Sequence, residues 1–459
     1  MTTSGPEGPT RPNRARRDER TGRLTGGPDA PTHPTAGAEP ATRRIARAVR
    51  GVLTDTRPLR TPAYRRLWTA GIVTVIGAQL SVVAVPAQIY ELTGSSAYVG
   101  LTGLFGLVPL VVFGLWGGAI ADAVDRRTLL LFSGGGIALS SLALWVTAAS
   151  GAGGVWLVLV LFAVQTAFLA INQPARNAVI PRLLPADQLP AANALNMTVF
   201  QVGAIAGPLL AGVLIPVIGL PTLYLLDAIA LLATLWATWR LPAVPPAGTG
   251  ARRRAGLREI VDGFRYAALH AVLLVSFLID IVAMAFGMPR AVFPEISQTV
   301  YGDPPGGGFA MGLLFAAIPL GMVAAGLFTG LLHRVRRQGV AVTLAICTWG
   351  VGVALFGLTS SLWLAVLFLA IAGAGDVISS VYRMSILQSV ATDEMRGRMQ
   401  GVFGVVVAGG PRVADLWHGP AAEWWGPGVA ASVGGVAVVV GAVVVVAAFP
   451  IFWRYRAAH

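Results

Sequence analysis

The stretch GGAIADAVDRRTLL, residues 117–130, decides how this chain is interpreted. It places Asp122, Asp125 and the pair Arg126 and Arg127 between two apolar runs. Each run has about 20 residues, enough to cross roughly 30 Å of hydrocarbon at 1.5 Å per residue. Charges at such a point indicate a turn outside the bilayer. The chain is therefore predicted to be an all-α membrane protein, since an unbroken helix satisfies its own backbone hydrogen bonds in lipid.

The composition agrees with a membrane protein and excludes an ordinary soluble one. Of 459 residues, 55% are hydrophobic and 12% are charged, whereas soluble domains have about 25% charged residues. The net charge of +13 would suggest nucleic acid as a partner of a soluble chain. Here the arginines collect in the N-terminal tail and in alternate loops, as is typical of cytoplasmic segments of membrane proteins. We therefore expect a lipid bilayer and no nucleic acid.

Twelve apolar segments follow a tail rich in Pro, Gly, Thr and Arg. The tail, residues 1–62, cannot bury enough apolar surface to fold alone and is expected to be a disordered, basic, cytoplasmic segment. The twelve segments, expected as transmembrane helices, lie at 66–91, 97–121, 128–149, 154–175, 191–216, 219–240, 270–296, 308–332, 339–359, 362–384, 398–418 and 428–453.

The loops between these segments alternate in charge. Every second loop is rich in arginine, and the loops between them contain none. By the positive-inside rule both termini are cytoplasmic, which requires an even number of crossings. The longest loop follows the sixth segment, so the expected organisation is an N-terminal six-helix half at 63–240, a cytoplasmic central loop at 241–269 and a C-terminal six-helix half at 270–455.

The two halves repeat each other weakly. At one offset of 210 positions, the second half matches the first at Phe105 and Phe315, Pro109 and Pro319, Leu110 and Leu320, and Arg126–Arg127 and Arg336–Arg337. A second echo joins Arg176 and Asp187 to Arg383 and Asp393. Two parallel six-helix repeats are typical of an alternating-access transporter.

The opening stretch resembles the loop signature between helices 2 and 3 of the major facilitator superfamily. The matching residues are Gly118, Asp122, Arg126, Arg127 and Leu130. The superfamily usually has a basic residue in place of Ala123 and often glycine in place of Asp125. The resemblance implies a cytoplasmic gate in which Asp122 meets the positive end of a helix or an arginine. The alternative for Arg126 and Arg127 is that they only fix the topology.

Further stretches narrow the resemblance. GAIAGPLLAG in the fifth segment, with Gly203, Gly207, Pro208 and Gly212, is similar to a signature of antiporter branches, although small residues four apart also serve plain helix packing. VAVPAQIYELTGSS, AAIPLG and SSVYRMSILQSVATDEMRGRMQGVFG resemble the enterobactin exporter and its relatives, a group that borders on macrolide and multidrug efflux carriers. This implies export of a small molecule.

Ionisable residues within the apolar segments are few and are the candidates for coupling. A proton-driven exporter needs a buried carboxylate that loads on one side and releases on the other. Asp280 is the first candidate because of its depth, followed by Asp376 and Asp415. For each of them the alternative is a structural ion pair, with Arg290, Arg383 or Arg412.

Three other residues are candidates for lining the substrate cavity. Arg290 follows Pro289, which is expected to kink the seventh helix, and its cation would suit an anionic cargo such as a catecholate siderophore. Gln79 and Gln88, nine residues apart on the first helix, face opposite directions. Either glutamine could instead form a hydrogen bond between helices.

These observations favour a multi-pass exporter in the cytoplasmic (plasma) membrane of a bacterium. We expect proton antiport of a siderophore of the enterobactin type; the alternative is multidrug or macrolide efflux on the same fold, and a third possibility is a membrane receptor or assembly factor without transport. The histidines are scattered and no phosphate-binding loop occurs, so no enzyme, metal or cofactor is expected. The expected partners are the small-molecule substrate, protons and lipid, with a monomer as the working unit.

Overall fold

The computed structural model describes residues 55–241, 257–328, 330 and 335–456, without the side chains of 115–119, 121–123 and 257–260. Of the tail predicted to be disordered, 1–62, residues 1–54 lie outside the described residues, as does most of the central loop, while the last residues of the tail form a 3-10 turn at Arg57–Arg60 and the start of a helix at Pro62. Every regular element in the described chain is a helix. The elements are η1 (Arg57–Arg60), α2 (Pro62–Thr93), α3 (Ser96–Ala123), α4 (Arg126–Ser150), α5 (Val155–Leu183), η2 (Ala186–Gln188), α6 (Leu189–Ile218), α7 (Leu220–Trp239), α8 (Leu257–Leu269), α9 (Ala271–Phe286), η3 (Arg290–Val292), α10 (Phe293–Thr299), α11 (Phe309–Gly326), α12 (Gln338–Leu358), α13 (Leu362–Val390), α14 (Asp393–Trp425), α15 (Pro427–Ala448) and α16 (Pro450–Arg454).

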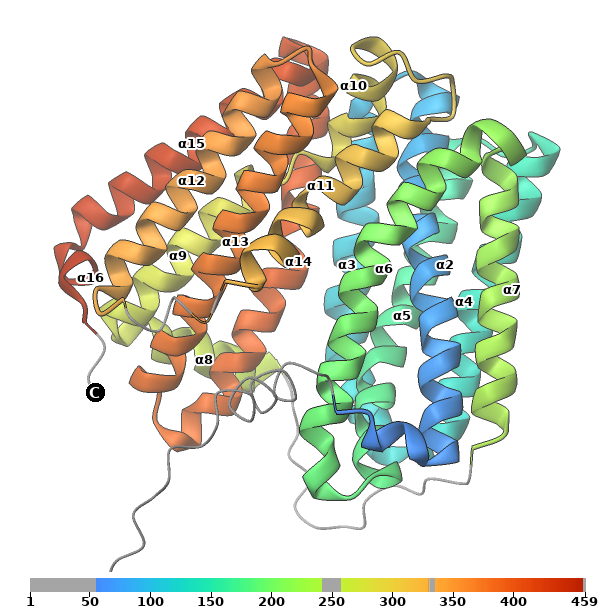
Figure 1. Ribbon diagram of the computed structural model, residues 1–459, viewed down its shortest axis with the longest axis horizontal. Coiled ribbons are helices and arrows are strands. Elements are labelled where there is room, and N and C mark those ends of the chain that lie inside the picture. The colour runs from blue at the N-terminus through green and yellow to red at the C-terminus, as the bar shows by residue number, and fades with distance from the viewer. Residues whose placement is uncertain (1–54, 242–256, 329, 331–334, 457–459) are drawn as a thin grey trace, which may run out of the picture. The chain divides into compact units, whose positions relative to one another are not determined.

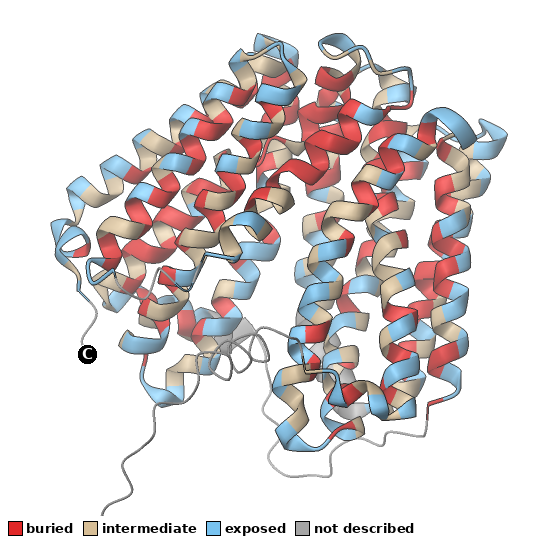
Figure 2. Ribbon diagram, in the orientation of Figure 1, coloured by how far each residue is buried: buried red, intermediate tan, exposed pale blue. Residues whose placement is uncertain are grey.

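The helices form two bundles, α2–α7 and α9–α16 (Figure 1). In the first bundle α4 packs against α5 and α7, and α2 packs against α6 and α7. In the second, α12 packs against α13 and α15, and α11 packs against α13. Buried residues line the helix faces that meet inside each bundle and between the bundles, while exposed residues cover the outer faces (Figure 2).

Eleven helical segments in the described chain are long and apolar enough to cross a membrane. They match eleven of the twelve predicted segments. The remaining one corresponds to α14, which has 33 residues but carries Arg412 and Asp415 in its apolar part. Several helices also extend beyond their apolar residues. The sequence predicts that the fourth segment ends near residue 175, whereas α5 ends at Leu183. Hydropathy marks the part of a helix in hydrocarbon, whereas the backbone hydrogen bonds continue into the aqueous zone.

The seventh predicted segment is broken rather than only kinked. α9 ends at Phe286, and a short 3-10 turn leads into α10. The break frees the carbonyl of Gly287, which accepts a hydrogen bond of 2.8 Å from the indole Nε1 of the fully buried Trp349. A buried carbonyl needs such a donor, because leaving it unpaired in a membrane protein is costly. The central loop also contains an unexpected helix, α8, which packs against α14 and α9.

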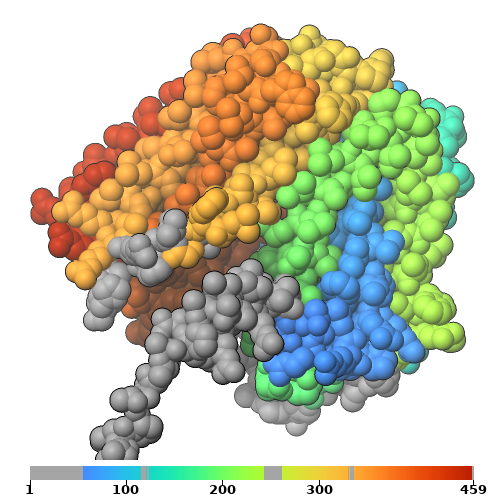
Figure 3. Space-filling view, in the orientation of Figure 1, coloured from blue at the N-terminus to red at the C-terminus, as the bar shows by residue number. Residues whose placement is uncertain are grey.

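The two bundles contact each other through two equivalent helix pairs. α3 packs against α14, and α11 packs against α6; in the space-filling view α11 lies directly beside α6 (Figure 3). α3 and α11 are the second helices of their halves, and α6 and α14 are the fifth. The halves are therefore exchanged by a pseudo-twofold axis, as expected for a duplicated transporter.

The closest approaches between the bundles lie at the end where α3 begins and α6 ends. A Cβ atom on Gly100 would lie 2.6 Å from the carbonyl oxygen of Asp415 and 3.0 Å from Cα of Gly419. A Cβ on Gly212 would lie 2.8 Å from the carbonyl oxygen of Gly308 and 2.9 Å from Cα of Gly312. Only glycine fits, because the neighbouring atoms are backbone. Ser96 adds a hydrogen bond of 2.5 Å from its hydroxyl to Glu295 across the same contact.

Valine in place of Gly212 should prevent this end from closing. The Ser96 side chain, which is buried here, serves as a reporter if it is changed to cysteine in a Cys347→Ser background. We expect Gly212→Val to make that cysteine react several-fold faster with a membrane-impermeant maleimide. Gly114→Val is the matched control, because nothing lies within 4 Å of a Cβ at Gly114. Equal labelling rates in the two variants would show that the glycine contact does not control closure.

A buried charge cluster as the candidate functional site

The second half contains a buried ion pair between Asp280 on α9 and Arg383 on α13. Both side chains are inaccessible to solvent, and a second carboxylate, Asp376, lies 4.0 Å from the same guanidinium. Among the described residues no conventional hydrogen bond satisfies the Asp280 oxygens or the Arg383 nitrogens. The ring of Phe403 covers the guanidinium, with 5.6 Å between Cζ and the ring centre. One cation is thus shared, unequally, by two acids.

A narrow pocket opens beside this pair. It is lined by Leu273, Ser276, Phe277, Asp280, Arg383, Leu387 and Phe403. The side chains fill this crevice so closely that no water molecule fits inside it. The pair is therefore packed away from solvent, and no cargo site is formed beside it in this conformation.

A third acid and two more arginines extend the cluster. Asp415 on α14 interacts electrostatically with Arg290 and Arg412. Arg290 also interacts electrostatically with Asp376, so it links the two carboxylates. Two of the three acids that the sequence singled out, Asp280 and Asp376, thus lie at one arginine, whereas Asp415 is linked to them only through longer-range interaction with Arg290. Asp280 forms an ion pair with Arg383, and Asp376 lies 4.0 Å from the same arginine, at the limit of an ion pair. For these two acids the structure therefore shows the ion pairing that the sequence analysis gave as the alternative to proton coupling.

The gate motif is only partly described. Gly118 and Asp122 lie in α3, but their side chains are outside the described ones. Asp125, where the superfamily often has glycine, caps α4 by accepting a 3.0 Å hydrogen bond from the backbone N–H of Thr128. Arg127 donates to the carbonyl of Trp239, the last residue of α7, a favourable place for a cation.

The repeated arginines of the second half are placed differently. Arg126 is buried, with 5% of its surface accessible. Arg336 and Arg337 are exposed, and Arg337 immediately precedes α12. The sequence repeat at these positions therefore does not extend to equal surroundings.

The remaining candidates on α2 and α6 mostly contact other helices. Gln88 is buried and accepts a 2.8 Å hydrogen bond from the hydroxyl of Tyr224 on α7, which is the interhelical alternative. Gln79 is half-buried and packs against Gly207. Gly203 packs against Val75 in the same way. Pro208 is buried within α6, and its carbonyl lies 2.6 Å from the position of a Cβ on Gly312.

The first half contains a buried acid outside this cluster. Asp227 on α7 accepts hydrogen bonds from Ser81 on α2 at 2.9 Å and Ser141 on α4 at 2.8 Å. Gln165 on α5 donates to the same Ser141 hydroxyl at 2.8 Å. This carboxylate joins three helices through hydroxyl groups, without an ion pair among the described residues.

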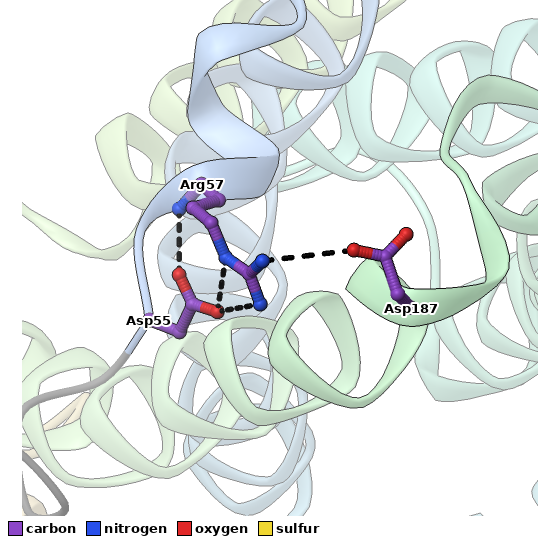
Figure 4. A network of polar contacts seen from close by, with 3 residues as sticks. All are labelled: Asp55, Arg57 and Asp187. Atoms are coloured by element: carbon purple, nitrogen blue, oxygen red, sulfur yellow. Dashed lines mark hydrogen bonds and ion pairs between the residues drawn. The ribbon is translucent and has the colours of Figure 1, made fainter.

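Where the described chain begins, a surface network ties η1 to η2. Arg57 lies between Asp55, 2.7 Å away, and Asp187, 3.6 Å away (Figure 4). Hydrogen bonds from Arg57 lower the pKa of the Asp55 carboxyl. All three side chains are exposed, so the network positions the start of α2 with little effect on stability.

The sequence of the chain matches a known family over nearly all of this architecture. A profile described as transmembrane secretion effector, of the major facilitator class, matches residues 53–452. The chain belongs to this family. It is therefore a transporter, a multi-pass protein of the bacterial inner membrane, in a family whose members transport rather than catalyse.

One relative of this transporter is the enterobactin exporter EntS of Shigella boydii, which is 28% identical over 352 residues. The alignment covers 74% of this chain and 81% of that exporter. EntS of Citrobacter koseri is 29% identical with the same coverage. Among solved structures, the nucleoside transporter NupG superposes with a TM-score of 0.66 at 13% identity, covering 84% of this chain and 98% of NupG. A bacterial homologue of the lysosomal transporter Spinster, solved inward-facing and unoccupied, gives 0.66 at 15%, covering 87% and 97%. These two structures support the fold alone.

The Asp280–Arg383 pair can be tested by a double-mutant cycle. Asp280→Asn leaves a buried guanidinium with only the distant Asp376, and breaking a buried pair costs about 3–5 kcal/mol. We expect Asp280→Asn and Arg383→Gln each to lower the unfolding temperature of the purified transporter. The double variant should recover part of the loss, since it removes both charges. Losses that simply add would show that the two groups do not stabilise each other.

Proposed function

We propose that this transporter exports a small molecule, a siderophore of the enterobactin type, in exchange for protons. The observation that carries the proposal is the buried Asp280–Arg383–Asp376 cluster, in a chain related to enterobactin exporters. The related exporters support the cargo, and the shared cation supports the coupling. Multidrug or macrolide efflux on the same fold is the alternative. The working unit is proposed to be a monomer.

We further propose twelve crossings with both termini in the cytoplasm. α14, the twelfth crossing, is long enough, since 33 residues span about 50 Å at 1.5 Å each. Its charged residues lie in the cluster with Arg290, as intramembrane charges generally face a partner. With this orientation, the contacts of Gly100 and Gly212 close the extracytoplasmic end of the transporter. The opposite ends of the two halves, which lie apart from each other in Figure 1, then face the cytoplasm. The transporter is then in an inward-facing state, ready to load cargo.

The coupling step follows from the unequal sharing of Arg383. A proton that binds Asp280 removes the charge that holds the guanidinium, and Arg383 then moves towards Asp376, 4.0 Å away. Release of the proton restores the first pairing. Because Asp280 is on α9 and both other groups are on α13, the exchange changes the force between two helices. A change of this kind biases one of two conformations, as coupling requires.

Export can be tested in Escherichia coli that lacks its enterobactin exporter. Expression of this transporter should raise enterobactin in the medium several-fold over an empty vector, measured by liquid chromatography and mass spectrometry under iron limitation. Gly212→Val, which we expect to prevent closure, should release no enterobactin above the empty vector. Macrolide resistance without enterobactin release would favour the alternative cargo.

Coupling can be tested in proteoliposomes by separating gradient-driven transport from exchange. Asp376→Asn leaves Arg383 no second carboxylate to pair with, so transport driven by a proton gradient should fall at least about tenfold, which corresponds to 1.4 kcal/mol. Enterobactin exchange at equal pH should continue, because it needs no net proton movement. Asp227→Asn is the control, since its serine donors can still bond the amide oxygen. Equal losses in both assays would contradict a coupling role for Asp376.

A further inference from the structure

Arg176 occupies the place in the first half that Arg383 occupies in the second. α5 and α13 are the fourth helices of their halves. Arg176 lies seven residues before Leu183, the end of α5, and Arg383 lies seven residues before Val390, the end of α13. The pseudo-twofold relation of the halves therefore makes these two arginines counterparts.

Their partners are not counterparts. Asp280, the partner of Arg383, lies nine residues after the start of α9. The residue nine positions after the start of α2 is Gly71. The guanidinium of Arg176 lies directly against this glycine, so that a Cβ on Gly71 would collide with it. Where the second half has a carboxylate, the first half has only a hydrogen atom.

Arg176 consequently has no charge partner among the described residues. No ion pair or side-chain hydrogen bond of Arg176 occurs there, and its side chain is half-buried. Tyr64 is the titratable group that interacts with it electrostatically. The hydroxyl of Tyr64 already donates to the carbonyl of Ala192 at 3.1 Å. A cation in a membrane-spanning helix is costly without a partner and usually serves function.

We propose that Arg176 binds the anionic group of the exported compound on its way in from the cytoplasm. A guanidinium pairs with a carboxylate through two parallel hydrogen bonds, so the group assigned to Arg176 is a carboxylate of a small anionic acid. The proposal rests on the proposed export function and assigns its binding group. The two arginines then have separate tasks: Arg383 is held by its own acids, and Arg176 is left for cargo.

The proposal predicts a specific effect of the missing acid. Gly71→Asp would give Arg176 the internal partner that Arg383 has, and cargo would have to displace it. Gly71→Asn adds a side chain of the same size without the charge and serves as the matched control. In both variants the contact is with the end of the flexible Arg176 side chain, which can shift.

The experiment measures binding of two probes to the purified full-length transporter. 2,3-Dihydroxybenzoate carries the carboxylate, and 2,3-dihydroxybenzamide has the same catechol with an uncharged amide in place of the carboxylate. Wild type should prefer the benzoate at least about tenfold, as a charge-assisted pair implies. Arg176→Gln and Gly71→Asp should abolish the preference, whereas Arg176→Lys and Gly71→Asn should keep most of it. Thermal unfolding of each variant confirms that it is folded.

Several results would overturn the assignment: no preference in wild type, a preference that survives Arg176→Gln, or equal losses in Gly71→Asp and Gly71→Asn. Enterobactin release from cells separates this proposal from the function on which it rests. If wild type releases enterobactin and Arg176→Gln releases it equally well, export stands and the role of Arg176 is wrong. If the benzoate preference depends on Arg176 but wild type releases no enterobactin, the cargo assignment fails and the anion site stands.

Discussion

The cost of placing charge where water is scarce is the constraint on which this structure depends. A lone arginine or aspartate in the membrane-spanning region is expensive, and a matched pair removes much of that cost. The second half meets this constraint with Asp280 and Arg383, in contact and fully buried. Asp376 at 4.0 Å keeps the arrangement from being a simple pair. Arg383 therefore has one acid in direct contact and a second acid at a longer distance.

The first half meets the same constraint by different means. Its buried acid, Asp227, is held by serine hydroxyls rather than by a cation. Its arginine, Arg176, faces a glycine. The duplicated halves have thus kept one backbone arrangement and distributed charge differently, so that a shared fold supports unequal tasks. The glycine contacts of α3 with α14 and of α6 with α11 remain symmetric.

Much of the fold could be predicted from the sequence, because hydropathy and loop arginines report directly on the bilayer. The predicted segments and the two halves follow from these patterns, including the segment 398–418, which forms α14 although its charges lower its hydropathy below that of the other eleven. Pro289 predicts a kink in the seventh segment, but a complete break after Phe286 is too local to follow from hydropathy. The arrangement of the candidate site was harder to predict from the sequence. Asp280, Asp376 and Asp415 could be selected as buried acids, but depth along a helix does not show which helix is adjacent. Arg383 was considered only as a possible partner, and Arg176 only as a sequence echo, since their difference depends on Gly71, a residue without chemistry of its own.

The break between α9 and α10 divides one predicted transmembrane segment into two helices that are joined by a short turn. Trp349 holds the joint by its hydrogen bond to Gly287. A few residues further on, Glu295 on α10 accepts a hydrogen bond from Ser96 of the other half. The contact between the two halves is therefore anchored on the shorter piece of the broken segment, so the joint beside Trp349 is the point about which the two pieces can turn relative to each other.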